Sequence, residues 1–136
     1  MVPDVTQLAI IESWHRAVNA SDAAAAGALC ADDVEVGGPR GAARGRAVVV
    51  EWVDRAGVRL EPVRWFCGAS GAVVEQDARW ADAATGALSE PVRLATAFGV
   101  DGGRITRVLR HPDLRGALAV LGLTASDEVT GRGATR

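Results

Sequence analysis

Hydrophobic side chains recur at helical spacing in the first part of the chain. The apolar positions that carry this spacing first are Leu8, Ile11, Trp14 and Val18. Intervals of three or four positions place them on one face of a helix. Two later segments show the same period, and Gly57 is well placed to end the last of them. The pattern predicts helices over residues 3–20, 23–30 and 46–56.

After Gly57 the hydrophobic period changes to two, which is typical of strands with one buried face. The pattern predicts strands over residues 58–67, 72–81, 91–100 and 104–111, a short earlier strand over 32–36, a loop over 40–45 and a final helix over 112–121. Helices grouped before an antiparallel meander indicate an α+β fold. We expect one domain over residues 1–129 and a flexible tail over 130–136.

Composition limits the class of protein more than it limits the function. The chain has 136 residues, of which 49% are hydrophobic and 24% are charged, as in ordinary globular domains. Its formal net charge is -2 and its sequence pI is about 5.6, so we expect no nucleic-acid partner. All of the 15 basic residues are arginines.

The cysteines and histidines predict neither a disulfide framework nor a metal site. Cys30, Cys67, His15 and His111 match no zinc template, and we expect both cysteines to be small buried residues. We therefore expect no metal and no cofactor. The first residues lack the basic and apolar segments of a signal peptide, and no apolar run reaches the ~20 residues of a membrane span. These features predict a cytoplasmic protein without a membrane partner.

Several short motifs resemble those of the nuclear transport factor 2-like superfamily, which includes SnoaL-like proteins and ketosteroid isomerases. The motifs are Trp14-x-x-Ala17-Val18-Asn19-Ala20-x-Asp22, Leu29-x-Ala31-Asp32-Asp33-Val34, Gly37-Gly38-Pro39, Gly45-Arg46 and Asp101-x-Gly103-Arg104-Ile105-x-Arg107. The resemblance covers residues 5–114. It implies a cone, in which a curved, mostly antiparallel sheet wraps over three helices. It also implies a ligand site at the open mouth and a homodimer through the outer face of the sheet.

The resemblance does not extend to the catalytic residues of the isomerases. Aligning the shared motifs puts Trp14 at the position of their helix-1 tyrosine, Gly38 at that of their general base and Thr96 at that of their second acid. A tryptophan N–H can donate a hydrogen bond, but a glycine cannot accept a proton. The isomerase mechanism therefore lacks its base.

A second comparison, with limonene epoxide hydrolases, also finds the catalytic acids replaced. Their arginine and two acids correspond here to Gln76, Ala78 and Arg110. SnoaL-type cyclases also use a carboxylate near the last of these positions. With a methyl group and a cation in place of the acids, activation of water by paired carboxylates is not available.

The same alignments, combined with strand alternation, imply which side chains face the cone's interior. The expected ligand-binding residues are Trp14, Trp52, Gln76, Trp80 and Arg110. This set would suit a small planar or apolar ligand with a carboxylate or carbonyl group, because an arginine can clamp a carboxylate with two hydrogen bonds. Other roles remain open: the tryptophans as core, Arg110 in an ion pair or in solvent, and Gln76 as the partner of a backbone group.

The opposite face of the sheet mixes paired charges with small apolar residues. We expect it to hold Glu75, Asp77, Arg79, Arg93, Ala95, Ala97, Ile105, Arg107 and Leu109. A solvated face would not need the apolar members, so the set predicts a homodimer interface. The alternative is that the frayed C-terminal segment covers this face. His15 is expected to face outward or to pack at an edge.

Two classes of function are therefore in view. The first is a pocket protein that binds a small apolar or aromatic molecule and lacks the family's isomerase and epoxide-hydrolase acids. The second is a dimeric scaffold whose cone is filled by its own tryptophans. A lyase or isomerase that uses His111 or Asp33 is a third reading. A hollow cone favours the first, and a packed cone favours the second.

Overall fold

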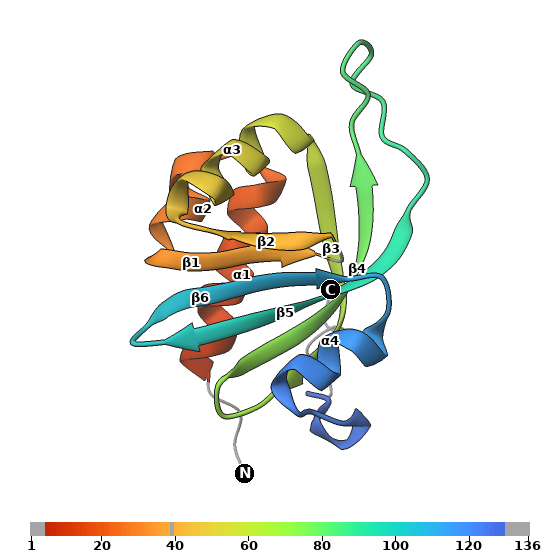
Figure 1. Ribbon diagram of the computed structural model, residues 1–136. Coiled ribbons are helices and arrows are strands. Elements are labelled where there is room, and N and C mark those ends of the chain that lie inside the picture. The colour runs from red at the N-terminus through yellow and green to blue at the C-terminus, as the bar shows by residue number, and fades with distance from the viewer. Residues whose placement is uncertain (1–4, 39, 130–136) are drawn as a thin grey trace.

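The structure is a computed structural model that describes residues 5–38 and 40–129 (Figure 1). Its helices are α1 (Val5–Asn19), α2 (Ala23–Ala28), α3 (Arg46–Ala56) and α4 (Leu114–Leu121), followed by a short 3-10 helix, η1 (Ala125–Asp127). Its strands are β1 (Cys30–Gly38), β2 (Gly41–Arg44), β3 (Val58–Cys67), β4 (Gly71–Trp80), β5 (Val92–Asp101) and β6 (Arg104–His111). The expected tail over 130–136 lies outside the described residues.

The six strands form one curved sheet in the order β2-β1-β6-β5-β4-β3. The antiparallel meander from β3 to β6 confirms the predicted order, and β1 joins it in parallel against β6. The prediction was wrong at residues 40–45, since residues 41–44 form β2 and pair with β1. All four residues of β2 are exposed, so the segment has no buried face to give it a hydrophobic alternation.

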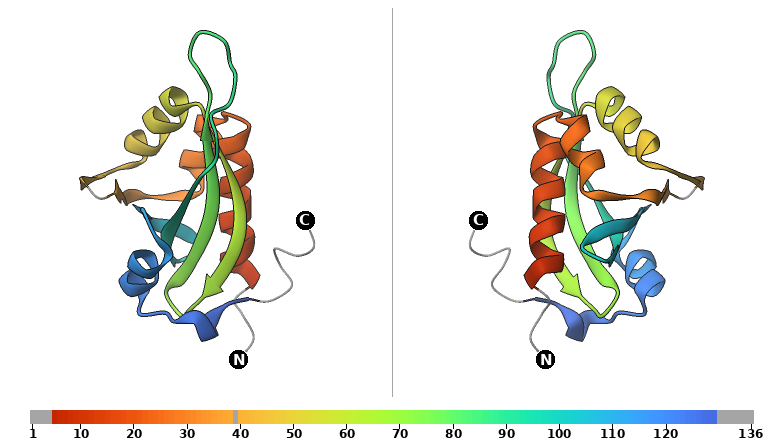
Figure 2. Two further views of the ribbon diagram at one scale, coloured as in Figure 1. Left: turned by 90° about the vertical axis from the view of Figure 1, so that its right-hand side faces the viewer. Right: turned by 90° about the vertical axis from the view of Figure 1, so that its left-hand side faces the viewer.

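The inner face of the sheet packs on α1, and α4 lies on the other side of the same strands (Figure 2). The inner core joins the apolar stripe of α1 to inward residues of the strands, such as Val74, Ala78 and Phe98. Burial of each large apolar side chain contributes roughly 1.5–3 kcal/mol, so this face supplies most of the cohesion between helix and sheet. The structure therefore has the predicted α+β architecture, a sheet wrapped over helices.

Irregular pairing between β5 and β6 places Ile105 on the inner face of the sheet and not on the expected outer face. Gly99 pairs with Arg107 and Val100 pairs with Ile105, so Thr106 is an extra residue on its strand. An extra residue reverses the alternation on one side of the bulge. Ile105 is consequently 0% exposed in the inner core, and its expected place on the outer face was wrong.

Helix α4 covers much of the outer face. Ala95 and Ala97 are buried in a second apolar cluster with Ala117 of α4. Small side chains on the strands let the helix approach closely. Helix α4 thus accounts for the burial of these alanines within one chain. The frayed C-terminal segment of the alternative reading lies outside the described residues. The homodimer remains a prediction. None of the described helices is long and apolar enough to cross a membrane.

Candidate functional site

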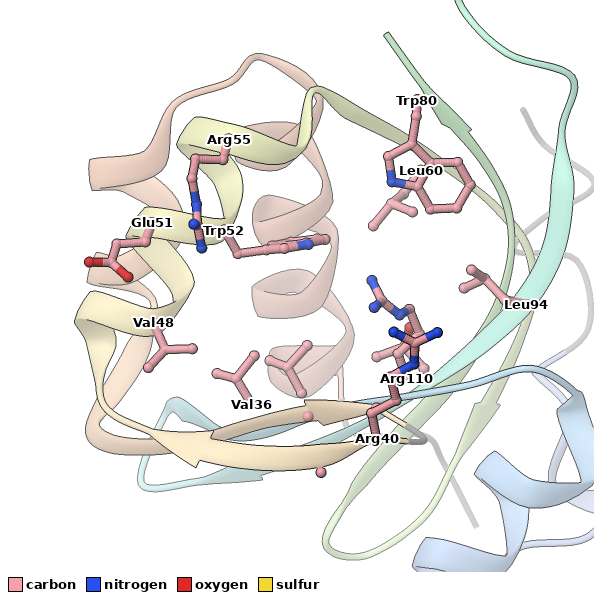
Figure 3. Close-up of a pocket in the computed structure, with 15 residues that line it drawn as sticks. Val36, Arg40, Val48, Glu51, Trp52, Arg55, Leu60, Trp80, Leu94 and Arg110 are labelled. Carbon is pink, nitrogen blue, oxygen red and sulfur yellow. The ribbon is translucent and has the colours of Figure 1, made fainter. Parts of the chain in front are cut away.

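A cavity of about 500 Å³ opens between α3 and the inner face of the sheet (Figure 3). All six strands contribute to its wall, together with α3 and Arg40 in the connection between β1 and β2. The turn from α3 into β3 beside this opening is set by the local sequence. Gly57 adopts a left-handed conformation, with φ of 57°, which ends α3 and lets the chain turn directly into β3.

Two tryptophans and two leucines form apolar walls on opposite sides of the cavity. Trp52 projects from α3, and Trp80, Leu60 and Leu94 face it across the space (Figure 3). Trp52 is backed by Trp14, with ring centroids 5.9 Å apart and only 9° between the ring planes. Such stacking fixes the orientation of the Trp52 ring and presents a flat surface to the cavity.

The polar part of the wall is mainly cationic. Arg40 and Arg110 direct their guanidinium groups into the space, and Arg55 also borders it (Figure 3). None of the three arginines makes a hydrogen bond or ion pair with another described residue. Glu51 is the one carboxylate among the described lining residues, and it points away from the centre of the cavity (Figure 3). The site is therefore suited to a negatively charged group.

Behind the wall lies a buried row of polar side chains that starts at Thr96, a lining residue. The Thr96 hydroxyl donates a hydrogen bond to Gln76 Oε1 over 2.8 Å. Gln76 Nε2 lies 2.8 Å from His15 Nε2, and His15 Nδ1 lies 2.8 Å from the carbonyl oxygen of Ile11. Burial lowers the pKa of His15 to about 4, against a smaller opposing effect of the Ile11 carbonyl. The imidazole is therefore neutral at pH 7.

The structure separates the expected ligand-binding residues into two layers. Trp52, Trp80 and Arg110 line the cavity. Trp14 and Gln76 lie one layer behind and are 1% and 0% exposed. Trp14 supports Trp52, and its buried Nε1 has no hydrogen-bond partner among the described residues. A ligand-binding role for any of the five residues remains a prediction.

The expectation for His15 was wrong, because this side chain is only 3% exposed. It packs beside Trp14, Trp65 and Phe98, with ring centroids between 5.3 and 5.8 Å away. A signal for its burial was present, since it follows Ile11 by four positions on the apolar stripe of α1. Its contact with Gln76 of a distant strand had no local signal.

Of the residues compared with catalytic acids, Gly38, Thr96 and Arg110 border the cavity, whereas Ala78 is buried behind it. A Cβ atom at Gly38 would lie 3.8 Å from Nη2 of Arg110, so the base position of the isomerases adjoins a cation here. His111 and Asp33 do not border the cavity. No three His, Cys, Asp or Glu side chains within the described residues gather as metal ligands.

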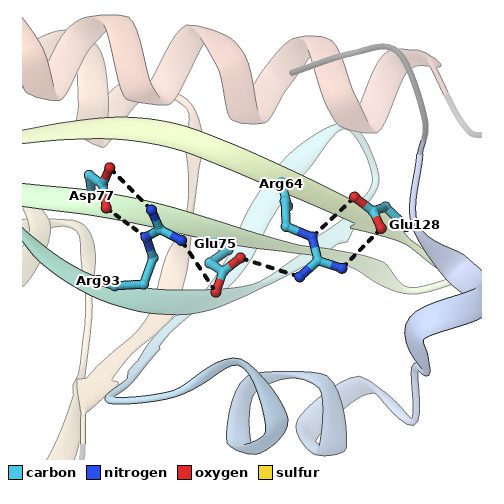
Figure 4. Close-up of polar contacts among 5 residues, drawn as sticks. All are labelled: Arg64, Glu75, Asp77, Arg93 and Glu128. Carbon is cyan, nitrogen blue, oxygen red and sulfur yellow. Dashed lines mark hydrogen bonds and ion pairs between the residues drawn. The ribbon is translucent and has the colours of Figure 1, made fainter. Parts of the chain in front are cut away.

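Charges on the outer face form ion pairs within the chain (Figure 4). Arg93 Nε lies 2.6 Å from Asp77 Oδ1, its cross-strand partner. Arg64 donates two hydrogen bonds to Glu128, and these lower the pKa of that carboxyl group. Glu75 lies between the two arginines, 3.7 and 4.0 Å from their nearest nitrogens. This outer-face network is defined as Arg64, Glu75, Asp77, Arg93 and Glu128.

The family model of the SnoaL-like domain matches residues 11–108, which is most of the chain. The protein therefore belongs to the SnoaL-like family, within the nuclear transport factor 2-like superfamily to which the sequence motifs pointed. No curated protein sequence matches it.

Solved structures of the same fold include three bacterial proteins. One is a nuclear transport factor 2-like protein of unknown function from Cytophaga hutchinsonii, with a TM-score of 0.69, 16% identity and coverage of 85% of this chain and 97% of that one. A candidate polyketide cyclase from Xanthomonas campestris has a TM-score of 0.68 and 20% identity, covering 84% of this chain and 95% of that one. A hypothetical protein with a ketosteroid isomerase-like fold from Catenulispora acidiphila, in complex with trimethylamine, has a TM-score of 0.66 and 21% identity, covering 86% and 95%. At these identities the likeness defines the fold.

Proposed function

We propose that the protein binds a small, planar, apolar or aromatic anion in the cavity between α3 and the sheet. The observation that carries the proposal is the combination of a hollow, tryptophan-walled space with guanidinium groups that have no partner among the described residues. A bound carboxylate would neutralise Arg110 and relieve its repulsion with Arg40.

The size of the cavity supports a ligand of about two fused rings. Ligand pockets commonly measure about 300–1,000 Å³, and this cavity, at about 500 Å³, falls inside that range. A scaffold with a cone filled by its own tryptophans is less well supported. Trp14 and Trp52 stack against each other on one side, and the space in front of Trp52 stays open.

The lining gives less support to catalysis than to binding. General acid–base chemistry needs a titratable group within hydrogen-bond reach of the substrate. The Xanthomonas campestris protein is described as a candidate cyclase. In this chain, however, the only carboxylate in the described lining is Glu51, which points away from the space. A reaction that uses His111 or Asp33 would have to occur outside the cavity.

The proposal predicts that Arg110→Ala weakens binding of 2-naphthoate by about 30-fold. Loss of a charge-assisted pair costs roughly 2 kcal/mol, which corresponds to that factor. Isothermal titration calorimetry of the wild type and the variant measures the change. Thermal unfolding of both proteins shows whether the fold has been kept.

Two further variants separate the clamp from general charge effects. Arg107→Ala removes the same charge from the same strand, but from the opposite face, and should leave affinity within about twofold. Gly38→Asp should abolish binding, because its carboxylate would lie beside the Arg110 guanidinium and occupy it. Wild-type protein that does not bind 2-naphthoate, or binds 2-naphthylamine equally well, would contradict the proposal.

A further inference from the structure

A row of buried hydrogen bonds runs from Ile11 through His15 and Gln76 to Thr96. Chemistry allows only one direction of donation along this row. The Ile11 carbonyl can only accept a hydrogen bond, so the His15 Nδ1 beside it must carry the proton. A neutral imidazole then has no proton on Nε2, which becomes an acceptor. The Gln76 amide nitrogen must donate to it, and the amide oxygen therefore faces Thr96.

This direction fixes the role of the last hydroxyl in the row. Thr96 has a single O–H, and that hydrogen is used in the 2.8 Å bond to Gln76 Oε1. Toward the cavity Thr96 has only oxygen lone pairs to offer. Thr96 and Gln76 are 3% and 0% exposed, so water cannot readily replace this partner and reverse the row.

The acceptor lies beside the cation of the proposed site. Thr96 and Arg110 are direct cross-strand partners, and both line the cavity. Directly opposed residues of an antiparallel pair have Cβ atoms about 5 Å apart on the same face. A ligand that uses both must therefore carry a donor group and an anionic group a few ångströms from each other.

We infer that the site selects aromatic hydroxy acids, whose hydroxyl group donates to Thr96 while the carboxylate pairs with Arg110. This inference rests on the proposed function and adds a discrimination that the proposed function alone does not contain. An ether or ketone at the position of the hydroxyl would bring an acceptor against an acceptor. Such a mismatch leaves two buried oxygen atoms without a hydrogen and costs affinity.

The direction of the row can be tested without a ligand. Nitrogen-15 NMR at neutral pH distinguishes the two neutral tautomers of histidine, and the chain has only two histidines to assign. We expect His15 to be protonated on Nδ1 and bare on Nε2. A proton on Nε2 would reverse the row and overturn the inference.

The selectivity is tested with a matched pair of probes, 4-hydroxy-2-naphthoate and 4-methoxy-2-naphthoate. We expect wild-type protein to bind the hydroxy acid about fivefold more tightly, the effect of one hydrogen bond. Equal affinity of both probes overturns the inference and leaves the proposed function standing if 2-naphthoate binds. Failure of all three compounds to bind removes the proposed function as well.

A variant outside the cavity shows that the row carries the effect. His15→Phe keeps an aromatic ring against Trp14, Trp65 and Phe98 but frees the Gln76 amide to turn. The ratio of the two affinities should fall to about twofold or less, since Thr96 could then donate or accept. The size of the methyl group affects both proteins equally and cancels in this comparison.

Two controls keep the test decisive. Gln7→Leu removes the hydrogen bond that another buried glutamine, on α1 itself, donates to the carbonyl of Ala69, outside the row, and should leave the ratio unchanged. A change as large as that of His15→Phe would overturn the inference. If His15→Phe does not fold, Thr96→Val and Thr96→Ser replace it. The first should lose the preference for the hydroxy acid and the second should keep it, and the reverse result overturns the inference.

Discussion

The buried imidazole of His15 makes the stability of the protein depend on pH. Burial lowers its pKa from 6.5 to about 4 in the folded state. Between these values the unfolded chain binds a proton that the folded chain does not. Because stability rises with pH wherever the unfolded state binds more protons, this contribution is complete above pH 6.5 and is lost as the pH falls toward 4.

The wild type should therefore lose about 2 kcal/mol more stability between pH 7 and pH 5 than the His15→Phe variant does. Urea denaturation at the two pH values, followed by circular dichroism, gives both free energies of unfolding. His111→Gln is the matched control and should behave like the wild type, because it retains His15. An equal loss in wild type and His15→Phe would show that His15 does not remain neutral in the folded protein.

At the scale of single residues the sequence predicted part of the cavity wall. Trp52 followed from the helical period, which is a local property, and Trp80 and Arg110 followed from the family alignments combined with strand alternation. The sequence did not predict that Gln76 links His15 to Thr96 by hydrogen bonds, because these partners are 61 and 20 positions away. Which atom donates in such a row depends on every member, so no single position reveals it.

Helix α4 is the element that decides what the outer face of the sheet can do. The predicted helix over 112–121 begins two residues later, where Asp113 caps it by accepting a hydrogen bond from Gly116 over 2.8 Å. Its Ala117 is 0% exposed against the strands, and Ala119 on the other side is exposed. The helix thus stabilises the fold through one narrow face.

This packing predicts unequal effects for two identical changes in α4. Ala117→Glu should destabilise the protein by about 3 kcal/mol or more, because it places a charge between helix and sheet. Ala119→Glu should cost less than about 1 kcal/mol. Chemical denaturation of both variants measures the difference. Similar values for the two would mean that α4 does not dock on the sheet as described.

At the scale of elements, the sequence predicted all four strands of the meander to within about one residue at each end, because each has a clear period of two. It did not predict β2 or the bulge at Thr106. Both depend on pairing between strands, and neither changes the local hydrophobic pattern. The predicted face of Ile105 was wrong for that reason.

For the whole molecule, we propose a homodimer through the part of the outer face that α4 leaves open. The arginines of the outer-face network remain accessible there, with side chains 40% and 52% exposed for Arg64 and Arg93. Alternating charges on an accessible face suit a self-complementary interface around a twofold axis.

Sedimentation equilibrium should therefore give a mass of twice the 14.1 kDa chain. Arg93→Glu should yield single chains, because it places a third carboxylate beside Glu75 and Asp77. Arg115→Glu, on the exposed side of α4, should leave the mass unchanged. A wild-type mass of one chain would contradict the dimer.

The stacking of Trp14 on Trp52 has a practical consequence for spectroscopy. The chain has four tryptophans and no tyrosine, so its near-ultraviolet absorption comes almost entirely from indole. Two nearly parallel indoles 5.9 Å apart couple their electronic transitions, and one of them faces the cavity. Any molecule that settles against Trp52 will change the emission and the circular dichroism of this pair. The protein thus carries an internal optical reporter that needs no added label.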